Sequence, residues 1–302
     1  MSNTVSRKHS RYEPALKLDE IEAIDMHVHI EVDHHGHQSL PPDLAEAAAK
    51  YFKADGPRPD IDGIAAYYRE RKMAAVVFTV DAETQLGHAA ISSEEIAEGA
   101  ARNNDVLIPF GSVDPRRHDA LEAAQRLIDE SGVRGFKFHP TVQGFDPSDE
   151  HFYPLYAALQ EAGSVALFHT GQTGIGAGMR GGRGFRLGLS NPILIDPVAA
   201  DFPDLQIIMA HPSVPWQDEA LAVATHKHNT WIDLSGWSPK YFPPELVRYA
   251  NSILRKRVLF GSDFPLLTPD RWIEDAQAMS LKPEVLPGIM KDNAVRLLKL
   301  DL

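Results

Sequence analysis

Two histidines that lie two residues apart, His27 and His29, are the first residues of the chain with a clear chemical use. They belong to the segment IDMHVHI (24–30), which we interpret as a β-strand. Because alternate side chains of a strand point to the same face, both imidazoles would face one point. Imidazole is the commonest metal-binding side chain, and two of them can bind one ion together. The alternative interpretation is that these are two ordinary histidines near a strand end. A complete metal site needs further ligands from other strands.

The composition limits which ligands and partners are available. With 302 residues, 43% of them hydrophobic and 24% charged, the chain can form two ordinary domains or one large α/β barrel. Its 30 basic and 42 acidic residues give a net charge of −12, which argues against nucleic acid or an anionic membrane as the general partner. The absence of cysteine excludes disulfides and thiolate ligands, so nitrogen and oxygen must hold any metal.

Residues 1–20 are polar and lack the apolar core of a signal peptide. No later segment is an uncharged apolar run of membrane length. We therefore expect a cytoplasmic protein without a membrane partner, in which an N-terminal arm (1–20) precedes a single domain (21–302).

Eight short runs rich in Val, Ile, Leu and Phe predict eight strands. The runs are Ile24–Ile30, Ala74–Asp81, Leu107–Asp114, Arg134–His139, Val165–Thr170, Gln206–His211, Thr230–Ser235 and Val258–Asp263. Segments with helical periodicity lie between them, such as Asp119–Ser131 before Gly132 and Phe152–Ala162 before Gly163. Alternating strands and helices in these numbers predict a TIM-type (β/α)₈ barrel, with an open doubly wound sheet as the alternative.

Two connections between the predicted strands are long. One spans 31–72 after the first strand, and the other spans 171–204 after the fifth. Both leave the carboxyl ends of strands, where such barrels place their active sites. The segment Gly171–Leu189 has seven glycines in its first fourteen residues, so its backbone can approach a ligand closely or move as a lid.

Side chains with chemical uses stand at the ends of five predicted strands. They are His27 and His29 on the first, Lys137 and His139 on the fourth, His169 on the fifth, His211 on the sixth and Asp263 on the eighth. Alternation along the strands predicts two rows of inward-facing side chains, each ending on a histidine. One row is Val165, Leu167 and His169, and the other is Ile207, Met209 and His211. Because the carboxyl ends of barrel strands meet at one rim, these residues predict a single cluster.

The cluster has the composition of a catalytic metal site. We expect His27, His29, His169 and Asp263 to bind one divalent ion and to leave a coordination position open for water. Such an ion lowers the pKa of its water to about 7. Asp263 would also take the proton, and His211 would act as a general acid/base or stabilise an oxyanion. Zinc is the metal we expect first, and manganese or iron(II) suits the same ligands.

On these residues the chain resembles the amidohydrolase superfamily, whose pattern is HxH on strand 1, histidines on strands 5 and 6, and aspartate on strand 8. The segment DMHVHI is most similar to the branch that contains aminocarboxymuconate-semialdehyde decarboxylase, a branch of one-metal enzymes. The stretches FKFHPTVQGF and LFHTGQTGIGAGMRGG are also similar to 4-hydroxyphenyl-β-ketoacyl-CoA hydrolases.

The resemblance implies a metal-dependent hydrolase of aromatic catabolism, in which activated water attacks a carbonyl and a carbon–carbon bond of a β-ketoacyl thioester breaks. The alternative that it implies is a non-oxidative decarboxylase of an aromatic or muconate-type acid. A barrel that binds metal without catalysis is a third hypothesis. It is disfavoured because an open coordination position beside a free histidine would then have no use.

Lys137 distinguishes two forms of the site. In two-metal members of the superfamily a strand-4 lysine carries a carbamate that bridges the ions. Here we expect one metal and an unmodified Lys137, which would contact a carbonyl or carboxylate substrate beside His139.

Further substrate contacts are predicted at Arg180 and Arg183 in the glycine-rich segment and at Trp237 and Tyr241 after the seventh strand. The alternatives are that the two arginines only supply surface charge and that the two aromatic residues serve ordinary packing or a subunit contact. We also expect the protein to be a homo-oligomer.

Overall fold

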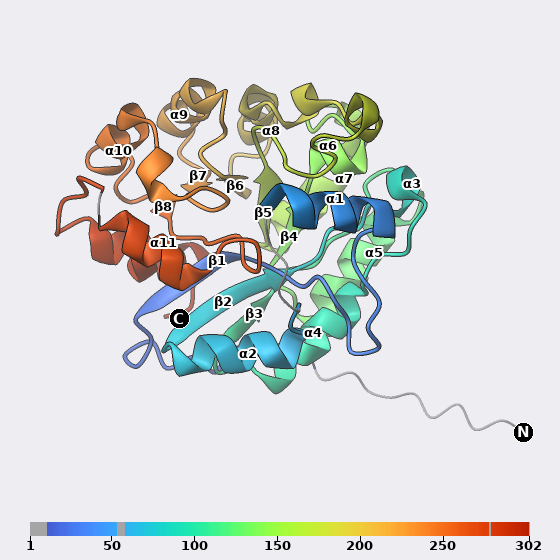
Figure 1. Ribbon diagram of the computed structural model, residues 1–302, viewed down its shortest axis with the longest axis horizontal. Helices are drawn as coiled ribbons and strands as arrows, with labels where there is room; N and C mark the ends of the chain where they lie inside the picture. The colour runs from blue at the N-terminus through green and yellow to red at the C-terminus, as the bar shows by residue number, and fades with distance from the viewer. Residues whose placement is uncertain (1–10, 53–57, 278, 302) are drawn as a thin grey trace, which may run out of the picture.

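The computed structural model describes residues 11–52, 58–277 and 279–301. Eight parallel strands follow one another around a barrel, with the helices outside them (Figure 1). The predicted TIM-type barrel is confirmed, and all eight predicted strands are present. Each ends at least one residue earlier than predicted, and the first two also begin one residue earlier. The strands are β1 (Ala23–His29), β2 (Met73–Phe78), β3 (Leu107–Pro109), β4 (Gly135–Phe138), β5 (Val165–His169), β6 (Gln206–Ala210), β7 (Thr230–Asp233) and β8 (Val258–Leu259).

The barrel is closed by contacts between two groups of strands. The ladders β1–β2–β3 and β4–β5–β6–β7–β8 are each continuous and parallel. A parallel bridge from Gly111 to Phe136 joins the third strand to the fourth, and a second bridge from Val28 to Phe264 joins the first to the segment after β8. Since the first and last strands meet, the open doubly wound sheet is excluded.

The helices form where the sequence combines an apolar face with end signals. They are α1 (Pro42–Phe52), α2 (Ile61–Glu70), α3 (Glu83–Leu86), α4 (Ser93–Arg102), α5 (Ala120–Arg126), α6 (Pro140–Gln143), α7 (Tyr153–Glu161), α8 (Ile195–Asp201), α9 (Gln217–His226), α10 (Pro244–Ala250), α11 (Pro269–Ala276) and α12 (Asn293–Leu298). Thr268 caps the start of α11, where its side chain accepts a hydrogen bond from the backbone N–H of Arg271. The predicted helix end at Gly132 is confirmed, at a φ of 74° that glycine adopts readily.

The two long connections build the rim of the barrel. The connection after β1 carries α1, and the one after β5 contains the short turns η3 (Arg180–Gly184), η4 (Leu187–Ser190) and η5 (Pro192–Leu194) before α8. Residues 11–20 of the predicted arm lie against the barrel, where the backbone N–H of Tyr12 donates to the carbonyl of Ser131 over 2.9 Å. Residues 1–10 of that arm lie outside the described residues.

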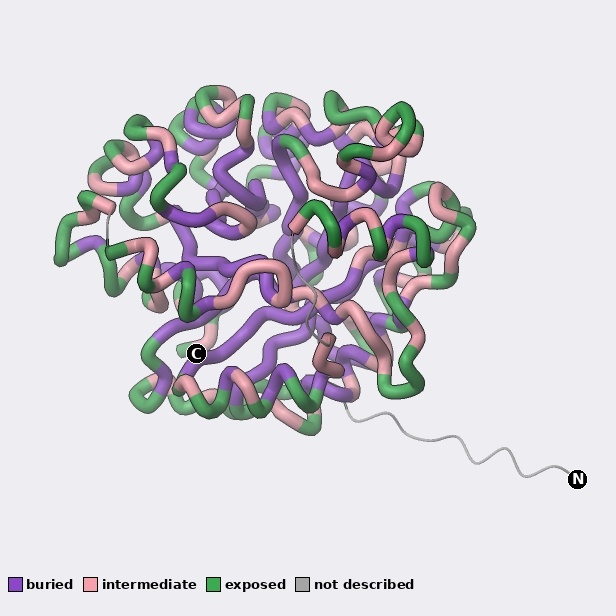
Figure 2. Tube along the Cα trace, in the orientation of Figure 1, coloured by how far each residue is buried: buried purple, intermediate pink, exposed green. Residues whose placement is uncertain are grey.

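Buried residues form one layer inside the barrel and one between the strands and the helices, and the strands are almost entirely buried (Figure 2). Leu167 of β5 belongs to the inner layer, as predicted. In β6, however, Ile207 and Met209 pack in the outer layer and Ile208 in the inner one, so the predicted inward row of this strand is wrong. His211 nevertheless reaches the inside because it follows the strand with a φ of 78°, which turns the chain out of the alternation.

A second break in alternation places the paired histidines. Asp25 pairs with Ala75 and Val28 with Val77, so two residues of β1 occupy the space of one residue of β2. This β-bulge moves the inward face from the apolar row of the strand to His27 and His29. The two histidines therefore share one face, as predicted, although the apolar residues before them do not set that face.

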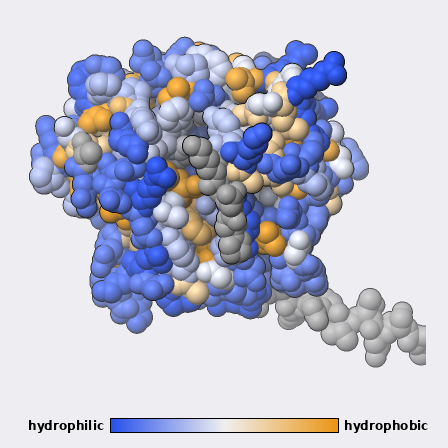
Figure 3. All heavy atoms as spheres, in the orientation of Figure 1, coloured by the Kyte–Doolittle hydropathy of each residue, from blue (hydrophilic) through white to orange (hydrophobic). Residues whose placement is uncertain are grey.

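Figure 3 shows a face that is mostly hydrophilic, with hydrophobic residues scattered over it. Within residues 11–52, 58–277 and 279–301, none of the helices has the length and apolar character that crossing a bilayer requires.

A buried carboxylate stabilises the barrel beside the bulge. Asp25 accepts hydrogen bonds from the backbone N–H groups of His27 (3.0 Å) and Ser262 (2.9 Å) and from the hydroxyl of Tyr68 (2.7 Å). Burial raises the pKa of Asp25 to about 6, and the hydrogen bonds from Ser262, Tyr68 and His27 limit the rise. The carboxylate thus ties β1 to the end of β8 and to α2.

We predict that Tyr68→Phe destabilises the protein by about 1–3 kcal/mol, because a buried carboxylate loses a donor while the volume is kept. Tyr67→Phe is the matched control, since the hydroxyl of Tyr67 donates to the exposed Asp270 over 2.8 Å. Its cost should be well under that of Tyr68→Phe. Urea denaturation followed by circular dichroism measures both, and equal losses would contradict the role given to Asp25.

Candidate metal centre

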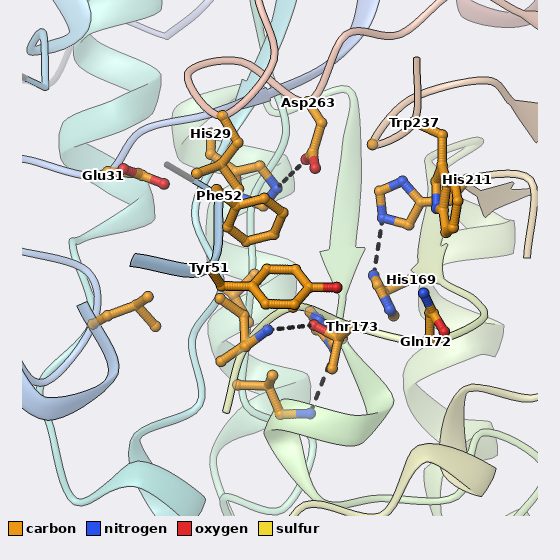
Figure 4. Close-up of a pocket in the computed structure, with 18 of the residues that line it drawn as sticks. His29, Glu31, Tyr51, Phe52, His169, Gln172, Thr173, His211, Trp237 and Asp263 are labelled. Atoms are coloured by element: carbon orange, nitrogen blue, oxygen red, sulfur yellow. Dashed lines mark hydrogen bonds and ion pairs between the residues drawn. The ribbon is translucent and has the colours of Figure 1, made fainter. Parts of the chain in front are cut away.

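Three side chains at the rim of the barrel, His27, His29 and Asp263, bring their ligand atoms together. Figure 4 shows two of them, His29 and Asp263, at the wall of the pocket. The Nε2 atoms of His27 and His29 lie 3.2 Å apart, and Oδ1 of Asp263 lies 3.4 Å from the first and 3.2 Å from the second. Ligands bound to zinc at about 2.0–2.2 Å in tetrahedral geometry lie roughly 3.4 Å from one another. The spacing of the three atoms therefore fits neighbouring ligands of one divalent ion.

The backbone holds Asp263 in this position. Its φ is 74°, and its N–H donates to the carbonyl of His27 over 3.0 Å. Burial by itself would raise the pKa of Asp263, but the hydrogen bond with His29 and the neighbouring His27 and His211 bring it well below its usual range. Asp263 is therefore an anionic carboxylate rather than a proton donor.

His169 and His211 lie together on the other wall. Nδ1 of His169 is 2.9 Å from Nε2 of His211, and the rings of His27 and His211 have centroids 4.8 Å apart. His169 is brought to the same rim as the three clustered ligands but beside His211, so its place in the metal set stays a prediction. Its Nε2 is buried and has no hydrogen-bond partner in the described part of the chain.

The donor set suits a divalent cation. It offers imidazole nitrogens and a carboxylate, which are ligands that such cations bind. The buried Nε2 of His169 has no hydrogen-bond partner among the described residues, and a bound ion would provide one. Burial lowers the pKa of both His27 and His169 well below the ordinary value. The imidazoles are thus neutral, which is the form that binds metal.

Lys137 and His139 both face into the barrel, as predicted for substrate contacts. Nζ of Lys137 is fully buried and lies 3.1 Å from Nε2 of His27. Burial lowers the pKa of Lys137 to about 8, against the attraction of Asp233 and Asp263. His139 stacks on His169 with ring centroids 3.8 Å apart.

A cavity of about 340 Å³ opens above the cluster. Trp237 and Tyr241 line it, and their contact with a substrate stays a prediction. Arg180 and Arg183 do not line it. Arg180 is exposed, and Arg183 pairs with Asp43 of α1 through an Nε–Oδ2 contact of 2.7 Å.

Sequence reasoning missed two groups of residues. One comprises the cavity-lining side chains that the long connections supply: Glu31, Tyr51, Phe52, Gln172 and Thr173. The other is Asp233, whose Oδ2 lies 2.8 Å from Nδ1 of His27. The signal for Asp233 was its place at the end of the seventh predicted strand, on the rim where the other candidates end.

The sequence model of the amidohydrolase family matches residues 24–300. The chain belongs to this family. The chain matches no curated protein. Members of the amidohydrolase superfamily bind a divalent metal, in agreement with the ligand cluster at the rim.

Similar solved structures have the same fold. An uncharacterised TIM-barrel protein from Bordetella bronchiseptica has a TM-score of 0.75 at 22% identity, over 92% of this chain and 98% of that one. A 2,6-dihydroxybenzoate decarboxylase from Rhizobium has a TM-score of 0.68 at 15% identity, over 93% and 100%. A dihydroxybenzoic acid decarboxylase from a Polaromonas species, with bound manganese and an inhibitor, has a TM-score of 0.67 at 16% identity, over 93% and 98%. At these identities the likeness establishes the barrel for this amidohydrolase and leaves its substrate to other arguments.

We predict that this amidohydrolase binds one metal ion per chain and that Lys137→Met keeps it, since His27, His29 and Asp263 remain in place. Methionine removes the charge and keeps most of the volume. Metal analysis after dialysis in the presence and absence of bicarbonate measures the stoichiometry. Two ions in the wild type, or loss of metal in Lys137→Met, would indicate a carbamate bridge.

Proposed function

We propose that the protein is a metal-dependent, non-oxidative decarboxylase of an aromatic or muconate-type acid. The observation that carries the proposal is the arrangement at the cavity floor, where the buried Lys137 amine lies beside the ligands His27, His29 and Asp263. A cation next to a metal suits the carboxylate of an acid. The aromatic residues on the wall suit a planar ring, and two of the similar barrels are named as decarboxylases of dihydroxybenzoic acids.

In this reaction a proton adds to the carbon that bears the carboxylate. The bond between that carbon and the carboxylate then breaks, its electron pair returns to the ring, and carbon dioxide leaves. His27, His29 and Asp263, with His169 as the predicted fourth ligand, would hold the ion. When bound, the ion would fix an oxygen of the acid and withdraw charge from it.

His211 is the residue that would carry the proton. It is buried and lines the cavity, so it can contact the reacting carbon. Asp263 is a poorer donor because its pKa is held low. Lys137 would neutralise the substrate carboxylate before it is lost.

Hydrolysis of a β-ketoacyl thioester, which was the first expectation from the sequence, stays a prediction, as does the preference for zinc. The two reactions differ in their products. Hydrolysis uses water and gives two carbonyl fragments, whereas decarboxylation consumes a proton and releases carbon dioxide.

We predict carbon dioxide release from a hydroxylated benzoic acid when the purified protein is loaded with zinc or manganese. A panel that includes 2,6-dihydroxybenzoate, with trapping of labelled carbon dioxide, measures it. Metal-depleted protein is the control and should be inactive. Cleavage of a β-ketoacyl thioester without decarboxylation of any acid in the panel would replace the proposal with the hydrolase alternative.

We also predict that His211→Asn and Asp263→Asn fail in different ways. His211→Asn should keep the metal and lose about 10²–10⁴-fold in turnover, the usual contribution of a positioned acid/base. Asp263→Asn should lose both turnover and metal, because an anionic ligand is removed. Metal analysis beside turnover separates them, and loss of metal from His211→Asn would place His211 among the ligands.

A further inference from the structure

We infer that Asp233 is the positioning residue of this centre, and that its single carboxylate sets which nitrogen of His27 carries the proton and orients Ser235 as an acceptor for His211. The inference deepens the proposed function, since it uses the roles given there to these two histidines. Asp233 ends β7 and is fully buried between them.

One oxygen of Asp233 fixes His27. Oδ2 lies 2.8 Å from Nδ1 of His27, and a carboxylate can only accept. Nδ1 must therefore carry the proton. Nε2 is left with its lone pair, facing His29 and Asp263 at 3.2 and 3.4 Å. A carboxylate behind a metal-binding histidine acts in this way in many metal sites.

The other oxygen acts on His211 through Ser235. Oδ1 accepts from the backbone N–H of Ser235 (2.8 Å), from its hydroxyl, and from the backbone N–H of His211 (3.4 Å). Because the hydroxyl proton of Ser235 goes to Asp233, its Oγ can only accept from Nδ1 of His211, 2.9 Å away. The carbonyl of Ser235 accepts from the same Nδ1 at 3.1 Å. Nε2 of His211 is left without a proton and faces Nδ1 of His169 as an acceptor at 2.9 Å.

Two glycines make room for this arrangement. A Cβ at Gly236, which has a φ of 75°, would lie 2.6 Å from Nδ1 of His211. A Cβ at Gly261 would lie 3.1 Å from Cβ of His27 and 3.3 Å from Oδ1 of Asp233. The two histidines and the carboxylate can pack this closely only because glycine stands at both positions.

The substitution Asp233→Asn tests the inference. Three donors converge on Oδ1, so asparagine would keep its oxygen there and turn its NH₂ toward Nδ1 of His27. His27 would then move its proton to Nε2 and be blocked as a ligand. We expect zinc affinity, measured by calorimetry with zinc alone, to fall about 10–100-fold. Two-bond ¹H–¹⁵N spectra of the metal-free protein, with His27 assigned from its loss in His27→Gln, should show the proton on Nε2.

Ser235→Ala is the matched variant. It keeps the contact between Asp233 and His27, so zinc affinity and the His27 spectrum should match the wild type. The His211 signal should shift because its Nδ1 loses the hydroxyl acceptor, while the proton stays on Nδ1 against the carbonyl of residue 235. Asp25→Asn is the control for placing an amide in this interior, because Asp25 contacts the backbone of His27 and not its ring. It should leave the proton of His27 on Nδ1.

Wild-type zinc affinity in Asp233→Asn, or an equal loss in Ser235→Ala, would overturn the inference. If Asp233→Asn does not fold, the spectrum of the metal-free wild type decides, because a proton on Nε2 of His27 would overturn the inference by itself. None of these measurements uses decarboxylation. Failure to release carbon dioxide would therefore refute the proposed function and leave the positioning role of Asp233 standing.

Discussion

The structure depends on burying polar and charged side chains at one end of an apolar barrel. His27, Lys137, Asp233 and Asp25 are all fully buried, and unpartnered groups of this kind cost several kcal/mol each. They are tolerated because each contacts another member of the set. Asp25 collects donors from β1, α2 and the end of β8, and Asp233 does the same for β1, β6 and β7. The strands of the barrel are thus tied together at the rim by the groups that would do the chemistry.

The same contacts fix the orientation of the imidazole rings in the centre. Each ring nitrogen of His27 faces a different partner, Asp233 on one side and the ligand cluster on the other. His211 is held by Ser235 at one nitrogen and meets His169 at the other. The proposed metal ligand His27 and the proposed proton carrier His211 are therefore held by neighbouring contacts in one network, which is how a rigid scaffold keeps a reactive site in place.

The cavity above this network comes from the connections rather than from the strands. Tyr51 and Phe52 of α1 and Trp237 after β7 are large side chains on segments of the rim, whereas the polar floor is fixed by strand ends. In barrels of this kind the connections can vary without disturbing the core, so substrate preference and chemistry are supplied by different parts of the chain.

The sequence by itself determined the barrel, its eight strands and the residues that meet at its rim, because local periodicity and strand-end position are properties of the chain alone. It also indicated that His27 and His29 share a face. Only the tertiary structure decided how these residues reach the inside, through the bulge in β1 and the positive φ of His211. Likewise, only the packed fold turned Arg183 toward Asp43 and brought Asp233 behind His27 across 206 residues of sequence. Such contacts depend on where distant segments meet and on irregular backbone at a few residues, and neither is encoded in the alternation of apolar and polar side chains.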